Sequence, residues 1–244
     1  MSSAEQRGSW SLTQPDYWWY RARADLLESA LGPYLGSPSR ILDVGSADGP
    51  SVGWVRARDR RLCVDVDPRG LPPGQGVCAS ADAIPFGDHT FDAAVAFDVV
   101  EHCPDRHQAL TELARVLRPG GRLLVSVPAY RWAWSDHDVR AGHYTRYTRP
   151  RIVADLRAAG LTVDRATYAF MAVFPMFAAE RAVRKLRAHN GGKSSDGVPQ
   201  VGPLADRVLR GLSRVDQRLL QRHDLPFGSS VFVAAHAPGP GAPA

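Results

Sequence analysis

The chain has 244 residues, of which 44% are hydrophobic and 23% are charged, and this balance fits one globular α/β domain with additions. No apolar run reaches the roughly 18 residues of a membrane-spanning helix, and no signal peptide is visible. The three cysteines lack the spacing of a disulfide framework, so we expect a reduced, cytoplasmic protein. The net charge of +5 comes mostly from arginine and fits a compositional bias of the genome.

The first predicted element is a helix that begins with four aromatic residues at 17–20. Residues 1–14 before it are polar and are expected to be disordered. Apolar residues then recur at helical spacing until Gly32-Pro33, which is expected to end the helix. The four rings either cover one edge of a sheet or form a lid over a ligand, and the sequence leaves both interpretations open.

The stretch 40–49 organises the rest of the chain. Its apolar residues 41–44 predict a buried parallel strand, followed by a glycine turn and, from residue 54, by an apolar pattern that can start a helix. Gly45 and Gly49 would let the backbone approach a ligand at the N-terminus of that helix. Asp43, at the end of the strand, is placed to accept a hydrogen bond from an amine.

The same turn argues against a dinucleotide-dependent oxidoreductase. A G-x-G-x-x-G fingerprint that starts at Gly45 needs glycine at positions 47 and 50, where this chain has Ala47 and Pro50. The geometry of a strand, a glycine turn and a helix is retained, so a different nucleotide ligand is expected.

Further strands are predicted at 61–66, 93–97, 122–127, 161–166 and 230–235, and a short third strand is predicted just before Asp82. The strands at 161–166 and 230–235 are expected to be neighbours in the sheet. Asp65, about 20 positions after the glycine turn, is expected to accept from both ribose hydroxyls, with Asp67 as the alternative. Asp82 could accept from an adenine amino group, while the backbone N–H of Ala83 donates to the ring. Helices are predicted after Asp105 and over 151–159, and a C-cap turn over 118–121.

Residues 40–128 resemble class I S-adenosylmethionine methyltransferases. The turn is similar to (D/E)-x-G-x-G-x-G with Ala47 in the middle glycine position. The segments 82–92, 98–105 and 117–123 resemble "D-a-x-x-L-P-F-x-D-x-x-F-D", "V-L-E-H-x-x-D" and "L-R-P-G-G-x-L" of the methyltransferase type 11 group, which includes relatives of quinone-biosynthesis methyltransferases. The resemblance implies a doubly wound, Rossmann-like seven-stranded sheet with helices on both faces. It also implies S-adenosylmethionine as cofactor, bound by Asp43, Gly45, Ser46, Ala47, Gly49, Asp65, Val66, Asp82, Ala83 and Asp98.

The loop 128–148 is interpreted as the wall of the acceptor site, since irregular segments at this edge of the sheet carry specificity. It is similar to "W-x-x-H-D…G-H-x-R-Y-T" segments of bacterial methyltransferases of this group; the alternative is a rigid aromatic brace. His102, His137 and His143 are the candidate bases, with His102 and His143 preferred and no means of choosing between them. A metal site could be assembled on paper from Glu101, His102 and Asp136–Asp138, but the spacing does not favour one and no metal is expected.

An insertion at 170–228 separates the last two predicted strands. Its second helix has an apolar face formed by Leu204, Val208, Leu212, Val215 and Leu219, with a stripe of arginines beside it. The predicted division is a disordered start at 1–14, a methyltransferase core at 15–169, the helical insertion at 170–228 as a cap or a membrane-facing unit, the last strand within 229–237, and a disordered tail at 238–244.

The sequence thus predicts a methyltransferase that acts on an oxygen of a small-molecule acceptor such as a sugar, a secondary metabolite or a lipid-linked intermediate. Peripheral membrane contact through 170–222 is one reading of the basic helix. No nucleic-acid partner is expected, because residues 98–101 lack the N/D-P-P-Y pattern of nucleobase methyltransferases. A non-catalytic S-adenosylmethionine-binding protein and a methyltransferase acting on RNA are the alternatives.

Overall fold

A computed structural model describes residues 16–45, 52–189 and 201–239, and side chains within 187–189 are not described. Its centre is a sheet with the strand order β3-β2-β1-β4-β5-β7-β6. The first five strands are parallel, and β7 runs antiparallel to both β5 and β6. The predicted Rossmann-like sheet and the pairing of its last two strands are confirmed. The strands are β1 (Arg40–Val44), β2 (Arg60–Asp65), β3 (Gly76–Cys78), β4 (Phe91–Phe97), β5 (Leu117–Pro128), β6 (Thr162–Ala169) and β7 (Ser230–His236).

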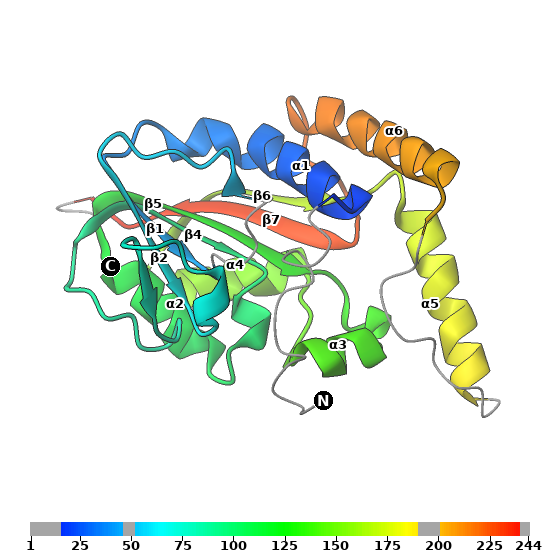
Figure 1. Ribbon diagram of the computed structural model, residues 1–244, viewed down its shortest axis with the longest axis horizontal. Helices are drawn as coiled ribbons and strands as arrows, with labels where there is room; N and C mark the ends of the chain where they lie inside the picture. The colour runs from blue at the N-terminus through cyan, green and yellow to red at the C-terminus, as the bar shows by residue number, and fades with distance from the viewer. Residues whose placement is uncertain (1–15, 46–51, 190–200, 240–244) are drawn as a thin grey trace.

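Helices cover both faces of the sheet (Figure 1). On one face α1 (Trp18–Leu35) lies beside α6 (Pro203–Leu220), and on the other lie α2 (Arg106–Arg115) and α4 (Arg149–Ala158). The short α3 (Asp136–Ala141) and the longer α5 (Phe174–His189) stand at the end of the molecule opposite the C-terminus (Figure 1). The central strands are mostly apolar because both of their faces are covered. In β4, all residues except Asp92 are alanine, valine or phenylalanine with at most 3% exposure.

The aromatic start of α1 packs into this core. Trp18 and Tyr20 are buried, and the rings of Trp18 and Trp19 both contact Phe170, which follows β6. The four aromatic residues therefore cover part of the sheet, which is the first of the two interpretations. The helix was expected to end at Gly32-Pro33, but it continues to Leu35, because Pro33 removes only one hydrogen bond near the helix end and Leu35 is buried.

Two further local predictions were wrong. No α-helix is present among the described residues 52–59; Val52 and Val55 instead close a single turn (3.0 Å) and are both buried, which accounts for the apolar pattern. The segment 118–121 is not the C-cap of α2 but part of β5, where the register against β4 shifts between Phe91 and Ala93. Gly120 has a positive φ of 76° there, which a bulge in an extended segment accommodates.

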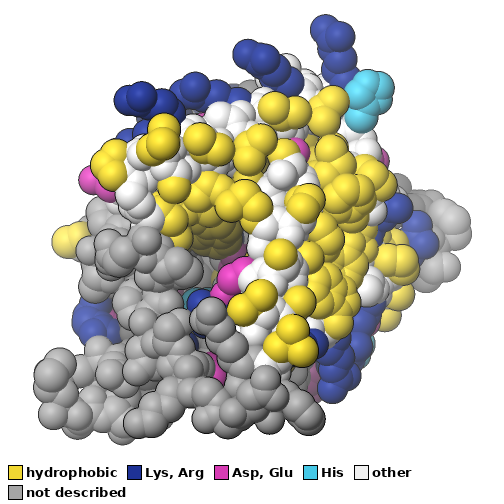
Figure 2. All heavy atoms as spheres, turned by 90° about the vertical axis from the view of Figure 1, so that its right-hand side faces the viewer, with side chains coloured by type: hydrophobic (Ala, Val, Ile, Leu, Met, Phe, Trp, Pro, Cys, Tyr) yellow, Lys and Arg dark blue, Asp and Glu magenta, His cyan; other side chains and the backbone are white. Residues whose placement is uncertain are grey.

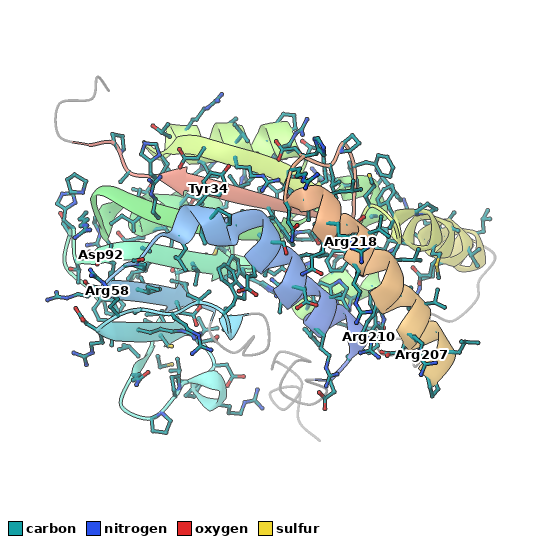
Figure 3. All side chains as sticks on the ribbon, turned by 90° about the horizontal axis from the view of Figure 1, so that it is seen from above. Tyr34, Arg58, Asp92, Arg207, Arg210 and Arg218 are labelled. Carbon is teal, nitrogen blue, oxygen red and sulfur yellow. The ribbon has the colours of Figure 1, made fainter. Side chains whose placement is uncertain are left out.

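Asp92, part of the family-like segment 82–92, has a structural role. Its carboxylate accepts from the backbone N–H groups of Ser39 (2.7 Å) and Arg40 (3.0 Å) and pairs with Arg118 (2.7 Å). Figure 3 places Asp92 and Arg58 at the edge of the sheet where the parallel strands begin. This carboxylate ties the entry of β1 to the entry of β4, away from the ligand edge.

The apolar face of α6 differs from the predicted one. Its fully covered residues are Leu209, Ser213, Asp216 and Leu220, whereas Leu204 is 74% exposed and Val208 and Val215 are also exposed. The helix therefore packs through a stripe that includes the polar residues Ser213 and Asp216. Asp216 faces the core because it accepts from the backbone N–H of Ala172 (3.0 Å), which follows β6. Leu204, Val208 and Val215 are thereby left uncovered by the part of the chain that the structure describes, whereas Leu212 and Leu219 pack partly against the core. Among the described helices, none has the length and apolar content needed to cross a bilayer.

Candidate active site

The carboxyl ends of β1, β2 and β4 meet at one edge of the sheet, and Gly45 occupies its centre. It follows β1 with a positive φ of 77°, and its N–H donates to the Val64 carbonyl of β2 (2.8 Å). A Cβ atom at this position would lie 2.4 Å from Cγ2 of Val99, so only glycine fits. The resulting cradle permits close approach of a ligand to the backbone. The predicted ligand residues Ser46, Ala47 and Gly49 lie outside the described residues.

Asp43 is buried and forms an ion pair with Arg61 of β2. Burial alone would lower the pKa of Arg61, but the charge and hydrogen bond of Asp43 outweigh it and raise that pKa above its ordinary value. Arg61 thus neutralises the Asp43 carboxylate through one of its oxygens and joins β1 to β2. The expectation that Asp43 accepts from a ligand amine stays a prediction.

Asp65 ends β2 and is buried, as expected for a carboxylate that binds a ribose. One of its oxygens accepts from the N–H of Asp67 (2.8 Å), which holds the carboxylate at the edge of the sheet. The alternative residue, Asp67, is engaged elsewhere: it caps the 3-10 helix η3 (Pro68–Gly70) and binds Arg69 through both oxygens. Val66, between the two acids, is 70% exposed and presents an apolar surface beside Asp65.

The predicted adenine contacts lie in the turn after β3. Asp82 is half-buried and stands near the thiol of Cys103, whose pKa burial and the Asp82 charge raise to about 12. The N–H of Ala83 donates to the Ser80 carbonyl (3.2 Å) and closes the turn. It is therefore already occupied by the protein, contrary to the expectation that it donates to a ligand ring.

Asp98 follows β4 with a positive φ of 54° and binds two residues of the protein. Its carboxylate pairs with Arg23 of α1 (3.0 Å) and accepts from the hydroxyl of Ser126 on β5 (2.9 Å), which in turn accepts from Arg23 (3.0 Å). Arg23 is fully buried and also lies over the ring of Trp19. This triangle joins α1 to the ends of two central strands and directs Asp98 away from a purely cofactor-binding role.

The three candidate histidines meet next to this triangle, and we call them the histidine cluster: His102, His137 and His143. The ring centroids of His102 and His143 are 4.6 Å apart, and those of His137 and His143 are 6.3 Å apart. His102 has solvent access at its outer edge, but burial of its inner side and the proximity of His143 lower its pKa to about 4. Burial likewise lowers the pKa of His137 to about 4. Both rings are therefore neutral at pH 7.

Asp138 orients the cluster. It is fully buried and accepts from Nδ1 of His143 (2.8 Å), from Nε of Arg146 (2.7 Å) and from the N–H of Ser135 (2.8 Å). Burial would raise the pKa of Asp138, but the hydrogen bonds and charges of His143 and Arg146 outweigh it and hold that pKa below its usual range. An ionised carboxylate on Nδ1 leaves Nε2 of His143 as the acceptor nitrogen, which is the arrangement of a base and its orienting acid.

Glu101 is the one fully buried acid of the site whose two carboxylate oxygens have no hydrogen-bond partner among the described residues. It belongs to the 3-10 helix η4 (Val100–His102), shortly after β4. Burial and then the charge of Asp98 raise the pKa of Glu101 well above its ordinary value. Tyr147, whose hydroxyl is also buried and has no hydrogen-bond partner in the described part of the chain, has its pKa raised by burial and by Glu101.

The predicted acceptor wall surrounds these groups. Residues 130 and 147 are joined by a backbone hydrogen bond (2.7 Å), and the ring of Tyr130 stacks on Tyr168 and on Trp132. Trp132 in turn contacts Phe174 at the start of α5. The loop braces the domain through its rings, as the alternative interpretation expected, and it also carries His137 and His143. Its role as the wall of an acceptor site stays a prediction.

Sequence reasoning missed Arg23, Ser126 and Arg146 as parts of the site, and it considered Asp138 only as a ligand of a metal site that the spacing did not favour. Arg23 carried a signal, since it stands four residues from Trp19 and from Leu27 on the apolar stripe of α1, where a charged residue needs a buried partner. Arg146 and Asp138 carried none, because their contacts form only when the loop folds back over β5.

Comparisons with known proteins agree with this geometry. Residues 42–125 match the model of a methyltransferase-domain family. An uncharacterized methyltransferase of Mycobacterium sp. (strain JLS) is 30% identical over 141 residues, which cover 52% of this chain and 56% of that protein. The chain spans between 47% and 65% of the length of the curated relatives it matches.

Two solved structures with S-adenosylhomocysteine share the fold. The 1,6-didemethyltoxoflavin-N1-methyltransferase of Burkholderia thailandensis superposes with a TM-score of 0.54 at 18% identity, covering 94% of this chain and 84% of that one. The N-methyltransferase NodS of Bradyrhizobium japonicum WM9 has a TM-score of 0.55 at 15% identity, covering 96% and 95%. Residues 42–125 therefore match a methyltransferase domain, and the chain shares the fold of these two methyltransferases.

Proposed function

We propose that the chain transfers a methyl group from S-adenosylmethionine to an oxygen of a small-molecule acceptor. The observation that carries this proposal is the position of the histidine cluster. His102 follows β4, and its N–H donates to the carbonyl of Val99 (2.9 Å), the residue whose side chain lies against Gly45. A hydroxyl acceptor must lose a proton during transfer, and histidine is the side chain best suited to accept it near neutral pH. The cluster thus supplies the one chemical function that the cofactor does not.

The residues at the sheet edge fit the cofactor. Gly45 allows the chain to approach it closely, Asp65 would accept from the ribose hydroxyls, and the exposed side chain of Val66 would cover one face of the adenine. S-adenosylmethionine supplies an electrophilic methyl group on a sulfonium. The protein's task is to align the acceptor with that methyl group and to exclude water, and alignment of this kind contributes a large part of the rate enhancement.

His143 is the base that the geometry favours in the metal-free protein. Its Nδ1 is held by Asp138, so Nε2 can accept the acceptor proton, while His102 and His137, with lowered pKa values, remain neutral neighbours. His143→Ala should lower the rate of methyl transfer by about 10²–10⁴-fold with little change in S-adenosylhomocysteine affinity. His107→Ala, an exposed histidine on α2, is the matched control and should leave the rate unchanged.

Cofactor binding is tested separately by calorimetric titration with S-adenosylhomocysteine. Asp65→Ala should abolish measurable binding while the protein keeps its melting temperature within a few degrees, because the side chain stands at the end of β2, at the rim of the sheet rather than in its apolar centre. Asp67→Ala, which removes the contacts to Arg69, should retain binding. Equal affinity in both variants would refute the ribose assignment.

The acceptor class is identified by incubating purified protein with methyl-labelled S-adenosylmethionine and an extract of the source cells. Label in the aqueous small-molecule fraction supports a free metabolite, and label in the organic fraction supports a lipid-linked acceptor. Label in RNA that falls steeply with salt would support the alternative of an RNA methyltransferase. Tight S-adenosylhomocysteine binding with no transfer to any fraction would favour a non-catalytic binding protein.

We also propose that α5 and α6 contact an anionic membrane surface, where a lipid-linked acceptor would be met. Exposed apolar side chains gather over this face, with arginines around them (Figure 2). They include Leu204 and Val208 of α6 and Met176 and Leu186 of α5. Figure 3 shows Arg207, Arg210 and Arg218 along α6. An apolar stripe with arginines beside it suits the boundary between headgroups and acyl chains.

Co-sedimentation with anionic vesicles tests the membrane contact. The protein should pellet at low salt, and Leu204→Glu should leave it in the supernatant. Val139→Glu, a substitution of another well-exposed apolar residue, on α3, is the control and should still pellet. Recovery of the unmodified protein in the supernatant at low salt would remove this proposal without affecting the methyltransferase assignment.

A further inference from the structure

Glu101, His102 and His143 bring three potential metal-ligand atoms together. One carboxylate oxygen and one ring nitrogen from each histidine lie within 4.8 Å of one another. The first two residues come from η4 after β4, and the third comes from the loop after α3, 42 and 41 positions later in the chain. This separation is why the sequence spacing did not favour a metal site.

The buried Glu101 carboxylate points to a missing partner. Both of its oxygens lack hydrogen bonds among the described residues, although the side chain is fully buried. The two arginines whose charges reach it are committed elsewhere: Arg23 binds Asp98 and Ser126, and Arg146 binds Asp138 and the Ala129 carbonyl (3.1 Å). A buried carboxylate without a partner is costly, and coordination of a cation is one of the few ways to satisfy it.

The orientation of His143 is that of a metal-bound histidine. Its Nδ1 donates to the buried Asp138, which leaves Nε2 as the nitrogen that can bind a metal ion beside Glu101 and His102. Ligating histidines usually hold a carboxylate on the second nitrogen, which fixes the ring and raises the basicity of the ligand nitrogen. The unpartnered carboxylate of Glu101 and the hydrogen bond between Asp138 and His143 are independent observations, and both indicate a metal site at these residues.

We propose that Glu101, His102 and His143 bind one divalent transition-metal ion of the zinc, cobalt or ferrous type. Two imidazoles and one carboxylate suit these ions, whereas magnesium and calcium prefer oxygen ligands. Ligands on one such ion at about 2.0–2.2 Å lie roughly 3.0–3.5 Å apart, so the ligand atoms, which lie within 4.8 Å of one another, need to approach by at most about 1.3–1.8 Å. Three protein ligands leave a coordination position open for a substrate.

The open position gives the metal a role that rests on the proposed function. An acceptor hydroxyl bound there would have its pKa lowered, so its proton would pass to solvent water, which reaches the exposed edge of His102, before methyl transfer. In the metal-bound protein Nε2 of His143 is a ligand, and acidification by the metal replaces its action as a base. Metal binding itself does not depend on the reaction and is measured without it.

The test is titration of chelator-treated full-length protein with Co²⁺, followed by visible absorbance, and with Zn²⁺, followed by calorimetry. We expect one equivalent to bind and the Co²⁺ spectrum to show the intense bands of a low-coordinate site. Glu101→Gln and His102→Ala should each weaken binding at least tenfold; His102 is exposed at its outer edge, so its removal is tolerated even if Glu101→Gln does not fold. His223→Ala, an exposed histidine outside the site, should change nothing.

A second control addresses Cys78, an exposed thiol that can bind the same ions. If Cys78→Ser removes the bound equivalent, or if Glu101→Gln and His102→Ala both leave the affinity unchanged, the proposal is overturned. Absence of binding by the unmodified protein overturns it as well. S-adenosylhomocysteine affinity, measured in the same samples, separates this result from the proposed function: a protein that binds the nucleotide but no metal keeps the methyltransferase assignment.

Discussion

Gly45 provides the sharpest test of how the ligand edge is built. Gly45→Ala introduces two separate costs. An alanine at a φ of 77° adopts a left-handed conformation, which costs about 1–2 kcal/mol. Its Cβ would also lie 2.4 Å from Cγ2 of Val99, and overpacking of this kind costs about 1–3 kcal/mol. The free energy of unfolding should therefore fall by roughly 2–5 kcal/mol.

Two further variants separate these costs. Gly160→Ala places alanine at a similar φ of 83° with no atom within 4 Å of the new Cβ, so only the backbone cost of about 1–2 kcal/mol should appear. Val99→Ala removes Cγ2, and adding Gly45→Ala to it should cost less than Gly45→Ala alone. The measurement is urea unfolding of the three single variants, the double variant and the unmodified protein, followed by circular dichroism.

The outcome that refutes the reasoning is additivity. If Gly45→Ala costs the same in the unmodified protein and in the Val99→Ala background, the close approach does not contribute. If Gly45→Ala costs no more than Gly160→Ala, the same conclusion follows from the control. A favourable coupling of about 1–3 kcal/mol in the double-mutant cycle would support the cradle.

Two other predictions concern stability. Hydrogen bonds from Arg115 and from the N–H of Ile84 lower the pKa of Glu112 from 4.5. The ionised Glu112 therefore stabilises the folded protein above the unfolded-state pKa, and this stabilisation is lost as the pH falls through the folded-state pKa. Glu112→Gln should lower the free energy of unfolding by about 1–3 kcal/mol at pH 7, and the variant should lose less stability than the unmodified protein below about pH 4.5. Parallel pH profiles of the two proteins in urea unfolding would contradict this. Asp216→Ala should lower the free energy of unfolding by about 1–3 kcal/mol, because the N–H of Ala172 loses its acceptor. Asp216→Asn keeps an acceptor oxygen and should lower it by less in thermal unfolding. The neutral amide also suits a site where burial raises the pKa of Asp216. Equal effects of the two Asp216 variants would show that this hydrogen bond does not anchor α6.

The parts of the fold that were predictable are those encoded by local pattern. The buried strand at Ile41–Val44 is apolar because neighbours cover both faces, and Asp65 ends the next strand because parallel strands end at one edge. Local pattern could not reveal which partner a charged residue chooses. Arg61 stands 18 positions after Asp43, and only the parallel pairing of β1 with β2 shows that it neutralises the predicted ligand carboxylate.

The contacts within the histidine cluster were likewise not predictable from local sequence pattern. His102, His137 and His143 were predicted as candidate bases from their positions near strand ends, and their mutual contacts appear only once the loop after β5 folds back. The orienting role of Asp138 depends on a six-residue helix whose capping box uses the same carboxylate that holds His143. Neither contact has a periodic signature in the sequence.

The family match covers the proposed cofactor edge of the chain but little of the proposed acceptor site, so relatives reveal little about the acceptor. The family match ends at residue 125 and contains the cofactor edge, including Gly45 and Asp65. The groups around the proposed acceptor site come mostly from beyond it: Asp138 and His143 belong to the segment after β5. Arg181 of α5 lies near them, because its pKa is lowered by burial and then by the charge of Arg146. Within the match, Glu101 and His102 lie with His143. We therefore expect changes in residues 128–187 to alter acceptor choice while S-adenosylmethionine affinity stays constant.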